Sequence, residues 1–166
     1  MDKNILYFKD NFFSAGRTEI YNEVKEIVGE LDLRSAFSSG IDVLDSKGKL
    51  IISGKFPMLG IKWRVYDSQE NELGSLGSKF SLFSKKFEYD ANGRGVFTIT
   101  SEAFSNEYEV LEGDISVASF EKISGFFASP AYQLKNDTDI LSNEELIAVV
   151  MGVNAIQKRQ RNNAGS

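Results

Sequence analysis

A repeat of about 22 residues constrains the fold of this chain more than any other feature of its sequence. The clearest copies are residues 41–50, 63–73 and 87–93, and the weaker ones are residues 20–23, 108–113 and 132–137. Each copy has alternating apolar residues, then Asp or Asn near Gly, as at Asp45 and Gly48, then a second alternating run. This pattern is typical of a strand, a tight turn and a second strand. Six copies therefore predict six hairpins, or about twelve strands.

Short apolar connectors separate the predicted hairpins, at residues 56–60, 80–84 and 126–130. Many short strands at such regular spacing favour a sandwich or a barrel. Closing the sheet on itself removes the exposed strand edges that invite aggregation. We therefore predict a mainly β fold, a twelve-stranded closed β-barrel of six hairpin repeats.

The last part of the chain breaks the repeat and predicts a helix over residues 142–158. Ser142 and Glu145 are spaced as a capping box, with Ser142 as the N-cap and Glu145 three residues later. The run that follows is apolar on nearly every side, which favours a helix buried inside the barrel. Membrane insertion is the alternative, but this run is shorter than the roughly 20 residues that span a bilayer. We expect one domain over residues 1–158 and a polar, disordered tail over residues 159–166.

The composition argues against an enzyme. The chain has no His and no Cys, so a Ser-His-Asp triad, a Cys-His pair or a histidine metal site cannot form. The turns at residues 45–48 and 90–93 have oxygen ligands that could bind Ca²⁺, but they lack the several carboxylates and the terminal Glu of a calcium loop. Acidic residues that recur in the repeat could act as catalysts, but their regular spacing is what turn formation predicts. These residues are Asp45, Asp67, Asp90 and Glu112. We expect no catalytic residue, no metal and no cofactor.

Charge and hydropathy limit the partners and the location of the chain. A net charge of −5 argues against a general nucleic-acid binder, which needs clustered Lys and Arg. Residues 1–11 carry too many charges for a secretory signal, and no segment is apolar enough for a transmembrane helix. The absence of Cys fits a reducing compartment. We expect a cytoplasmic protein.

Three parts of the sequence together resemble the LURP-one-related, tubby C-terminal-like family, which is related to the phospholipid scramblases. They are the segment YFKDNFFS at residues 7–14, the repeated strand–turn–strand units, and the run LIAVVMGVN at residues 146–154. The similarity covers almost all of the chain and implies a twelve-stranded barrel threaded by the C-terminal helix. The family often has Asp near the position of Asn154 and a more acidic tail, whereas the segment 158–161 is basic here.

The resemblance also implies a class of function. In tubby proteins, basic side chains on the outside of the barrel bind phosphoinositide headgroups, and the scramblase relatives act at membranes. Many bacterial and plant members have no established activity, and no binding motif of these relatives maps residue by residue onto this sequence. The resemblance therefore implies a non-enzymatic binding or tethering module.

A cluster of cations is the candidate site for an anionic headgroup. Lys79, Lys85 and Lys86 are interleaved with apolar residues, and Lys62 and Arg64 precede them by about one repeat. Cations beside apolar side chains suit an anionic lipid surface, at about 1 kcal/mol for each charge. The alternative is that these side chains solvate the outer face of a hairpin, which is the ordinary role of lysines on edge strands.

Three functions remain open at this point. The first is a tethering module that binds anionic lipid or phosphoinositide, and the second is a structural or protein-interaction barrel without lipid activity. The third, a small-molecule carrier, is less favoured because a helix in the lumen leaves little cavity for a ligand. Binding to lipid vesicles separates the first function from the other two.

Overall fold

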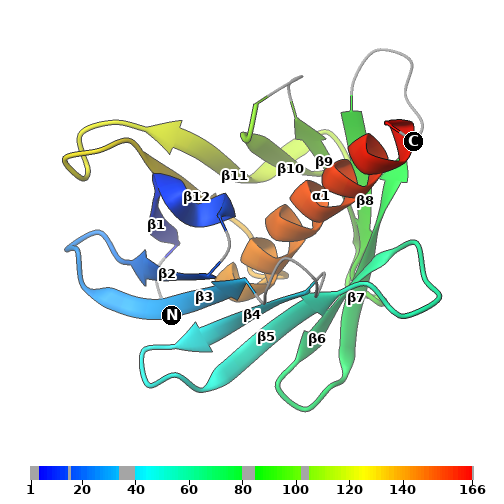
Figure 1. Cartoon of the computed structure of the whole chain (residues 1–166), viewed down its shortest axis with the longest axis horizontal. Coiled ribbons are helices and arrows are strands. Elements are labelled where there is room, and N and C mark those ends of the chain that lie inside the picture. Colours follow the sequence, from blue (N-terminus) through cyan, green and yellow to red (C-terminus); the bar gives the residue numbers. More distant parts are fainter. Residues whose placement is uncertain (1–3, 15, 34–39, 80–84, 102–104, 166) are drawn as a thin grey trace.

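Twelve antiparallel strands close into one barrel in the computed structural model, which describes residues 4–14, 16–33, 40–79, 85–101 and 105–165 (Figure 1). The strands are β1 (Ile5–Lys9), β2 (Gly16–Tyr21), β3 (Ile27–Leu33), β4 (Gly40–Asp45), β5 (Leu50–Lys55), β6 (Trp63–Asp67), β7 (Glu72–Lys79), β8 (Lys85–Asp90), β9 (Val96–Ser101), β10 (Tyr108–Glu112), β11 (Ile115–Ile123) and β12 (Ala131–Asn136). Each strand pairs with its sequence neighbours, and β1 pairs with β12 to close the sheet. A short 3-10 helix, η1 (Asp10–Phe13), follows β1, and the long helix α1 (Asn143–Ala164) ends the chain. The predicted twelve-stranded barrel with a C-terminal helix is confirmed.

The marker residue of the sequence repeat forms the same turn in successive units. Asp45 Oδ1 accepts hydrogen bonds from the backbone N–H groups two and four residues later, at 2.8 and 2.9 Å. The same two bonds reach Asp67 at 2.8 and 2.9 Å, and Asn22 at 3.1 and 2.9 Å. Asp90 and Asn136 each accept only the first of these bonds, and between β8 and β9 the backbone turn is closed at Ala91 instead. Three units of the repeat therefore share one turn chemistry, in which a short polar side chain bonds to its own backbone.

These turn carboxylates should make the fold sensitive to acid. Hydrogen bonds from the backbone of Lys49 and Lys47 lower the pKa of Asp45, and those from the side chain and backbone of Asn71 lower the pKa of Asp67. A pKa that is lower in the folded protein stabilises the fold above the unfolded value of about 3.9, and this contribution disappears as the pH falls through the folded value.

The Asp45→Asn, Asp67→Asn double variant tests this sensitivity. Because Asn does not titrate, the variant should lose less stability than the parent protein when the pH falls from about 6 to about 2.5. The measurement is the urea midpoint of unfolding at both pH values. Equal acid-induced losses of stability in the two proteins would show that these carboxylates contribute nothing to the acid sensitivity of the fold.

Helix α1 is buried in the barrel over most of its length. Nearly every residue from Asn143 to Gln157 is buried, and Ser142 Oγ accepts a hydrogen bond from Glu145 N at 3.1 Å as the predicted N-cap. The end differs from the prediction, because the helix continues to Ala164 through most of the expected disordered tail. The residues that follow the buried part are mainly Lys, Arg and Gln, which are strong helix formers. In the described part of the chain, no helix combines the length and the apolarity needed to cross a membrane.

One tryptophan in the barrel wall fixes the position of α1. Trp63 is only 1% exposed, and its Nε1 donates a hydrogen bond to Ala148 O in the helix at 3.1 Å. Two glycines lie against its ring: a Cβ added to Gly152 in α1 would lie 2.4 Å from Cδ1, and one added to Gly54 in β5 would lie 2.6 Å from Cζ2. The helix backbone therefore rests directly on the indole, which requires a residue without a side chain.

Candidate functional site

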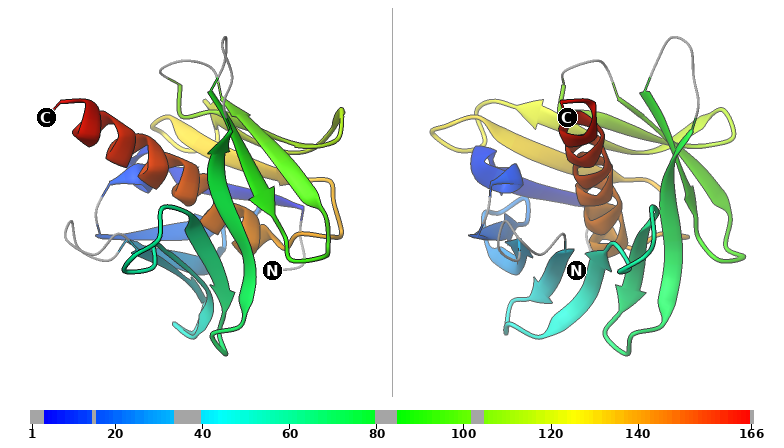
Figure 2. Two further views of the ribbon diagram at one scale, coloured as in Figure 1. Left: turned by 90° about the vertical axis from the view of Figure 1, so that its right-hand side faces the viewer. Right: turned by 45° about the vertical axis from the view of Figure 1, so that its right-hand side comes forward.

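The two ends of the barrel carry opposite charges. Because consecutive strands are antiparallel, the repeat's turns all lie at one end, and the connectors after β5 and β7 lie at the other. Acidic residues gather at the turn end, including Asp45, Asp67, Asp90, Glu112 and Asp114. The C-terminal turns of α1 protrude from the opposite end (Figures 1 and 2). We call this end the helix-exit mouth and define it by residues 55–62, the end of β7, the start of β8, and residues 158–161.

The basic end of the helix is held against the rim of this mouth. Gln160 Nε2 donates a hydrogen bond to Ser78 Oγ at the end of β7, at 2.7 Å. The guanidinium carbon of Arg159 lies 3.5 Å from the centre of the Phe56 ring, within reach of a cation–π interaction. The cations at the end of the helix therefore belong to the same surface as the strand ends.

The structure brings the predicted cations together at or near this mouth. Their neighbours Trp63, Leu76 and Phe87 point into the core, so the side chains that alternate with them point outward from β6, β7 and β8. The outward-pointing cations are Lys62, Arg64, Lys79 and Lys86, and the fifth predicted cation, Lys85, begins β8 at the rim. The Lys62 side chain lies over Gly77 of β7, which joins it to the same outer face.

Carboxylates on neighbouring strands neutralise two of the five cations. Arg64 Nη1 lies 2.6 Å from Glu72 Oε2, and Lys79 Nζ lies 2.9 Å from Glu88 Oε2. Such exposed pairs add little stability, but they reduce the charge that is left for a ligand. Arg64 and Lys79 are therefore weaker candidates than the sequence alone indicated.

The other three predicted cations lack a counter-ion among the described residues. Lys62, Lys85 and Lys86 are exposed and form no ion pair with any described residue. Lys86 lies directly opposite Lys79 in the register of β7 and β8, but Glu88, which pairs with Lys79, offsets the repulsion between the two lysines. Lys62, Lys85 and Lys86 are therefore the stronger candidates for contact with an anion.

A second feature of the mouth escaped the sequence analysis. Met58 and Leu59 are each 99% exposed and Ile61 is 89% exposed, and we call these three side chains the apolar loop tip. They lie between β5 and β6, where the sequence predicted only a connector. A run of apolar residues ordinarily indicates burial, and only the structure shows that these three point into solvent.

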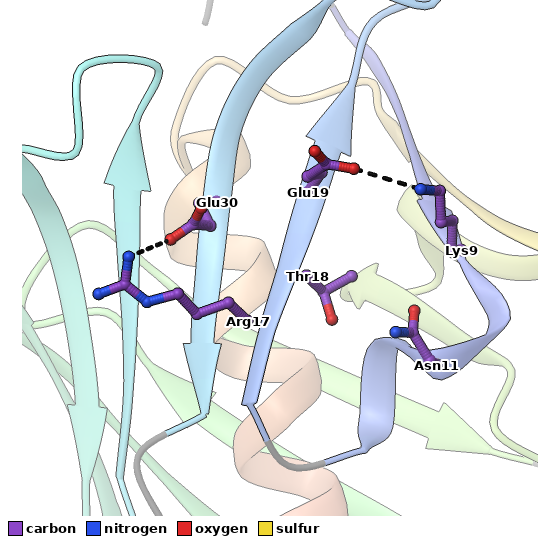
Figure 3. A pocket seen from close by; sticks show the side chains of 6 residues that line it. All are labelled: Lys9, Asn11, Arg17, Thr18, Glu19 and Glu30. Carbon is purple, nitrogen blue, oxygen red and sulfur yellow. Dashed lines mark hydrogen bonds and ion pairs between the residues drawn. The ribbon is translucent and has the colours of Figure 1, made fainter.

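A polar cavity of about 250 Å³ lies at the seam between β1 and β2 (Figure 3). Its lining residues are Lys9, Asn11, Arg17, Thr18, Glu19 and Glu30. Lys9 pairs with Glu19 at 3.2 Å, and Arg17 pairs with Glu30 at 3.0 Å. Hydrogen bonds from Tyr21 and then Lys9 lower the pKa of Glu19, whereas a general acid or base works best with a pKa near the working pH. The cavity is therefore internally neutralised and offers a weaker site than the mouth.

The acidic residues of the turns serve the backbone in the structure. Asp45 and Asp67 each direct one oxygen at two backbone N–H groups. Within the described residues, no three acidic side chains are grouped so that they could hold a metal ion. Turn formation therefore accounts for Asp45 and Asp67.

Comparison with known proteins identifies the family. The sequence model of the LURP-one-related family matches residues 5–149, from β1 into α1. An X-ray structure of a protein from Arabidopsis thaliana has the same fold, with a TM-score of 0.60 and 12% sequence identity over 90% of each chain. No curated protein matches the sequence. The chain belongs to the LURP-one-related family of the tubby-like superfamily.

Proposed function

We propose that this protein is a non-enzymatic module that attaches to anionic membrane surfaces through its helix-exit mouth. The observation that carries the proposal is the position of Lys62, Lys85 and Lys86, which pair with no described carboxylate, at one end of a barrel whose other end is acidic. Such a separation of charge orients the molecule, because an anionic surface attracts the mouth and repels the turns. The orientation arises even though the whole chain has a net charge of −5.

The cationic end of α1 adds to the same surface. Lys158, Arg159 and Arg161 are exposed, and the contact of Arg159 with Phe56 holds this part of the helix beside the rim. Each cation near an anionic leaflet contributes about 1 kcal/mol to attachment. Several together therefore support reversible binding without a deep pocket for one headgroup.

The proposal includes the cytoplasm as the site of action. A chain without Cys is suited to a reducing compartment, and the cytoplasmic leaflet is the one rich in anionic lipid. The absence of His and Cys from the sequence also supports a binding role rather than catalysis.

Charge reversal tests the proposal directly. The Lys85→Glu, Lys86→Glu variant should bind anionic vesicles at least about tenfold more weakly than the parent protein, because two favourable contacts become repulsive. Co-sedimentation with neutral, anionic and phosphoinositide-containing vesicles measures this effect, each at low and at physiological salt. Binding of the parent should weaken with added salt, since salt screens exposed charges.

A matched variant at the turn end provides the control. Lys47→Glu, Lys49→Glu changes the net charge equally but alters exposed residues between β4 and β5, away from the mouth. We expect it to bind vesicles nearly as well as the parent protein. Equal losses of vesicle affinity in both variants would show that only the net charge matters. A parent protein that binds no vesicles would favour the protein-interaction barrel.

A further inference from the structure

The apolar loop tip is unusual among the exposed apolar side chains of this protein. Val24, Ile27, Val96 and Ile115 are also exposed, by 50–70%, but they lie near the turn end. In contrast, Met58, Leu59 and Ile61 lie within four consecutive residues, and none is less than 89% exposed. Scattered apolar residues are normal on a protein surface, whereas a cluster indicates a surface that another phase or molecule covers.

The loop that carries this tip is anchored in the barrel. Gly60 N donates a hydrogen bond to Pro57 O at 3.1 Å, which closes a turn with Met58 and Leu59 at its centre. At the base of the loop, the ring of Phe56 is 92% buried and lies edge-on to that of Trp63, with 5.2 Å between the ring centres. The tip is therefore presented in a fixed position, so that binding need not first order the loop.

Cations lie at the base of the loop. Lys55 and Lys62 flank the loop in sequence, and Arg159 covers the ring of Phe56 at its base. None of these three forms an ion pair with a described carboxylate. An exposed apolar tip with cations at the base of its loop matches the chemistry of a bilayer with anionic headgroups above its hydrocarbon.

We infer that Met58, Leu59 and Ile61 insert into the hydrocarbon edge of an anionic bilayer while the surrounding cations lie among the headgroups. This inference rests on the proposed function and adds a mode of attachment to it. The size of the tip favours a bilayer over a protein partner. Three side chains on one loop offer on the order of a few hundred Å² of apolar surface, whereas a stable protein interface buries at least about 1,000 Å² of surface.

A fluorescent label on the tip tests insertion. Because the chain has no Cys, Leu59→Cys creates a single labelling position for an environment-sensitive dye. Vesicles of phosphatidylcholine and phosphatidylserine, with and without quenchers on the acyl chains, supply the readout. Ile115→Cys is the matched control, since Ile115 is 70% exposed near the turn between β10 and β11.

The result expected is quenching of the label at position 59 and none of the label at position 115. Co-sedimentation of both labelled proteins without quenching at position 59 would overturn the insertion while leaving electrostatic attachment intact. Failure of the parent protein and both labelled variants to sediment with any vesicle would overturn the proposed function itself.

A substitution at the same position provides a second readout. Leu59→Asp alters a fully exposed side chain, so its urea midpoint should match that of the parent protein. Its affinity for anionic vesicles should fall about tenfold to a hundredfold, because a charge would replace the leucine that enters the bilayer in the bound state. Ile115→Asp should leave the affinity unchanged. Unaltered binding by Leu59→Asp would contradict the inference.

Discussion

Replacing Arg94 by methionine is expected to lower the free energy of unfolding by about 3 kcal/mol. Arg94, in the turn between β8 and β9, forms a two-pronged ion pair with Glu145 in the first turn of α1, at 2.9 and 2.6 Å. The Glu145 side chain is only 2% exposed, so the substitution would leave a buried carboxylate without its counter-ion. We place the loss at the lower end of the range for buried pairs, because the Arg94 side chain is itself 35% exposed.

The same pair also determines how α1 enters the barrel. Arg94 donates further hydrogen bonds to the carbonyl oxygens of Leu73 and Ile140, and the Tyr89 hydroxyl donates to Glu145 Oε1 at 2.5 Å. Burial, and then the charge of Glu145, raise the pKa of Tyr89 far above its usual value, so the hydroxyl keeps its proton. One arginine thus ties β7, the segment before α1 and the helix itself together.

A double-mutant cycle separates the loss of the pair from the loss of packing. Glu145→Leu in the Arg94→Met background removes the unpaired buried charge, so the double variant should recover at least half of the stability that Arg94→Met loses. Urea unfolding followed by circular dichroism measures all four proteins. If the stability losses of the two single variants simply add in the double variant, the two side chains stabilise the fold independently.

Local sequence patterns explain why the fold was predictable. The hairpin turns at Asn22, Asp45 and Asp67 each depend on a side chain that bonds to backbone groups two and four residues away, so the cause lies within one short segment. The N-cap at Ser142 is equally local. Five of the repeats each form one hairpin, from β2–β3 to β10–β11, and the sixth contributes β12, which pairs with β1 to complete the twelve strands.

Non-local contacts explain what the sequence could not show. The capping-box pattern assigned Glu145 to the start of its own helix, but its carboxylate binds Arg94, which lies 51 residues earlier. Likewise, Glu72 and Glu88 neutralise Arg64 and Lys79 only because β6, β7 and β8 are neighbours in the sheet. Pairings of this kind depend on the completed barrel, so a sequence pattern identifies the cations without showing which remain free.

Exposure of the apolar loop tip also depends on the completed barrel. Phe56 and Leu59 are separated by two residues in one apolar segment, yet Phe56 is 92% buried and Leu59 is 99% exposed. The difference arises because Phe56 packs against Trp63 and Arg159, whereas the turn closed by Gly60 directs the following residues outward. Hydrophobicity alone assigns both residues to the core.

Replacing Gly152 by alanine is expected to lower the free energy of unfolding by about 2 kcal/mol. Alanine is the better helix former by about 1 kcal/mol, so propensity alone predicts stabilisation. Packing has the opposite effect on stability, because the new Cβ would lie 2.4 Å from Trp63 Cδ1 and 2.6 Å from Trp63 Nε1. The indole cannot retreat freely, since Gly54 lies against the same ring and Nε1 is bonded to Ala148 O. Overpacking of about 3 kcal/mol therefore outweighs the gain in propensity.

Gly165→Ala is the matched control, because it places the same methyl group at the exposed end of α1. There the nearest atom would lie 3.7 Å away, which is an ordinary contact, and the urea midpoint should change little. In a Trp63→Phe background, the smaller ring should reduce the penalty of Gly152→Ala, so the two losses should not add. Equal or greater stability of Gly152→Ala in the parent background would mean that the helix can shift away from Trp63 at little cost. The direct contact between the helix backbone and the indole would then not be what fixes α1 in the barrel.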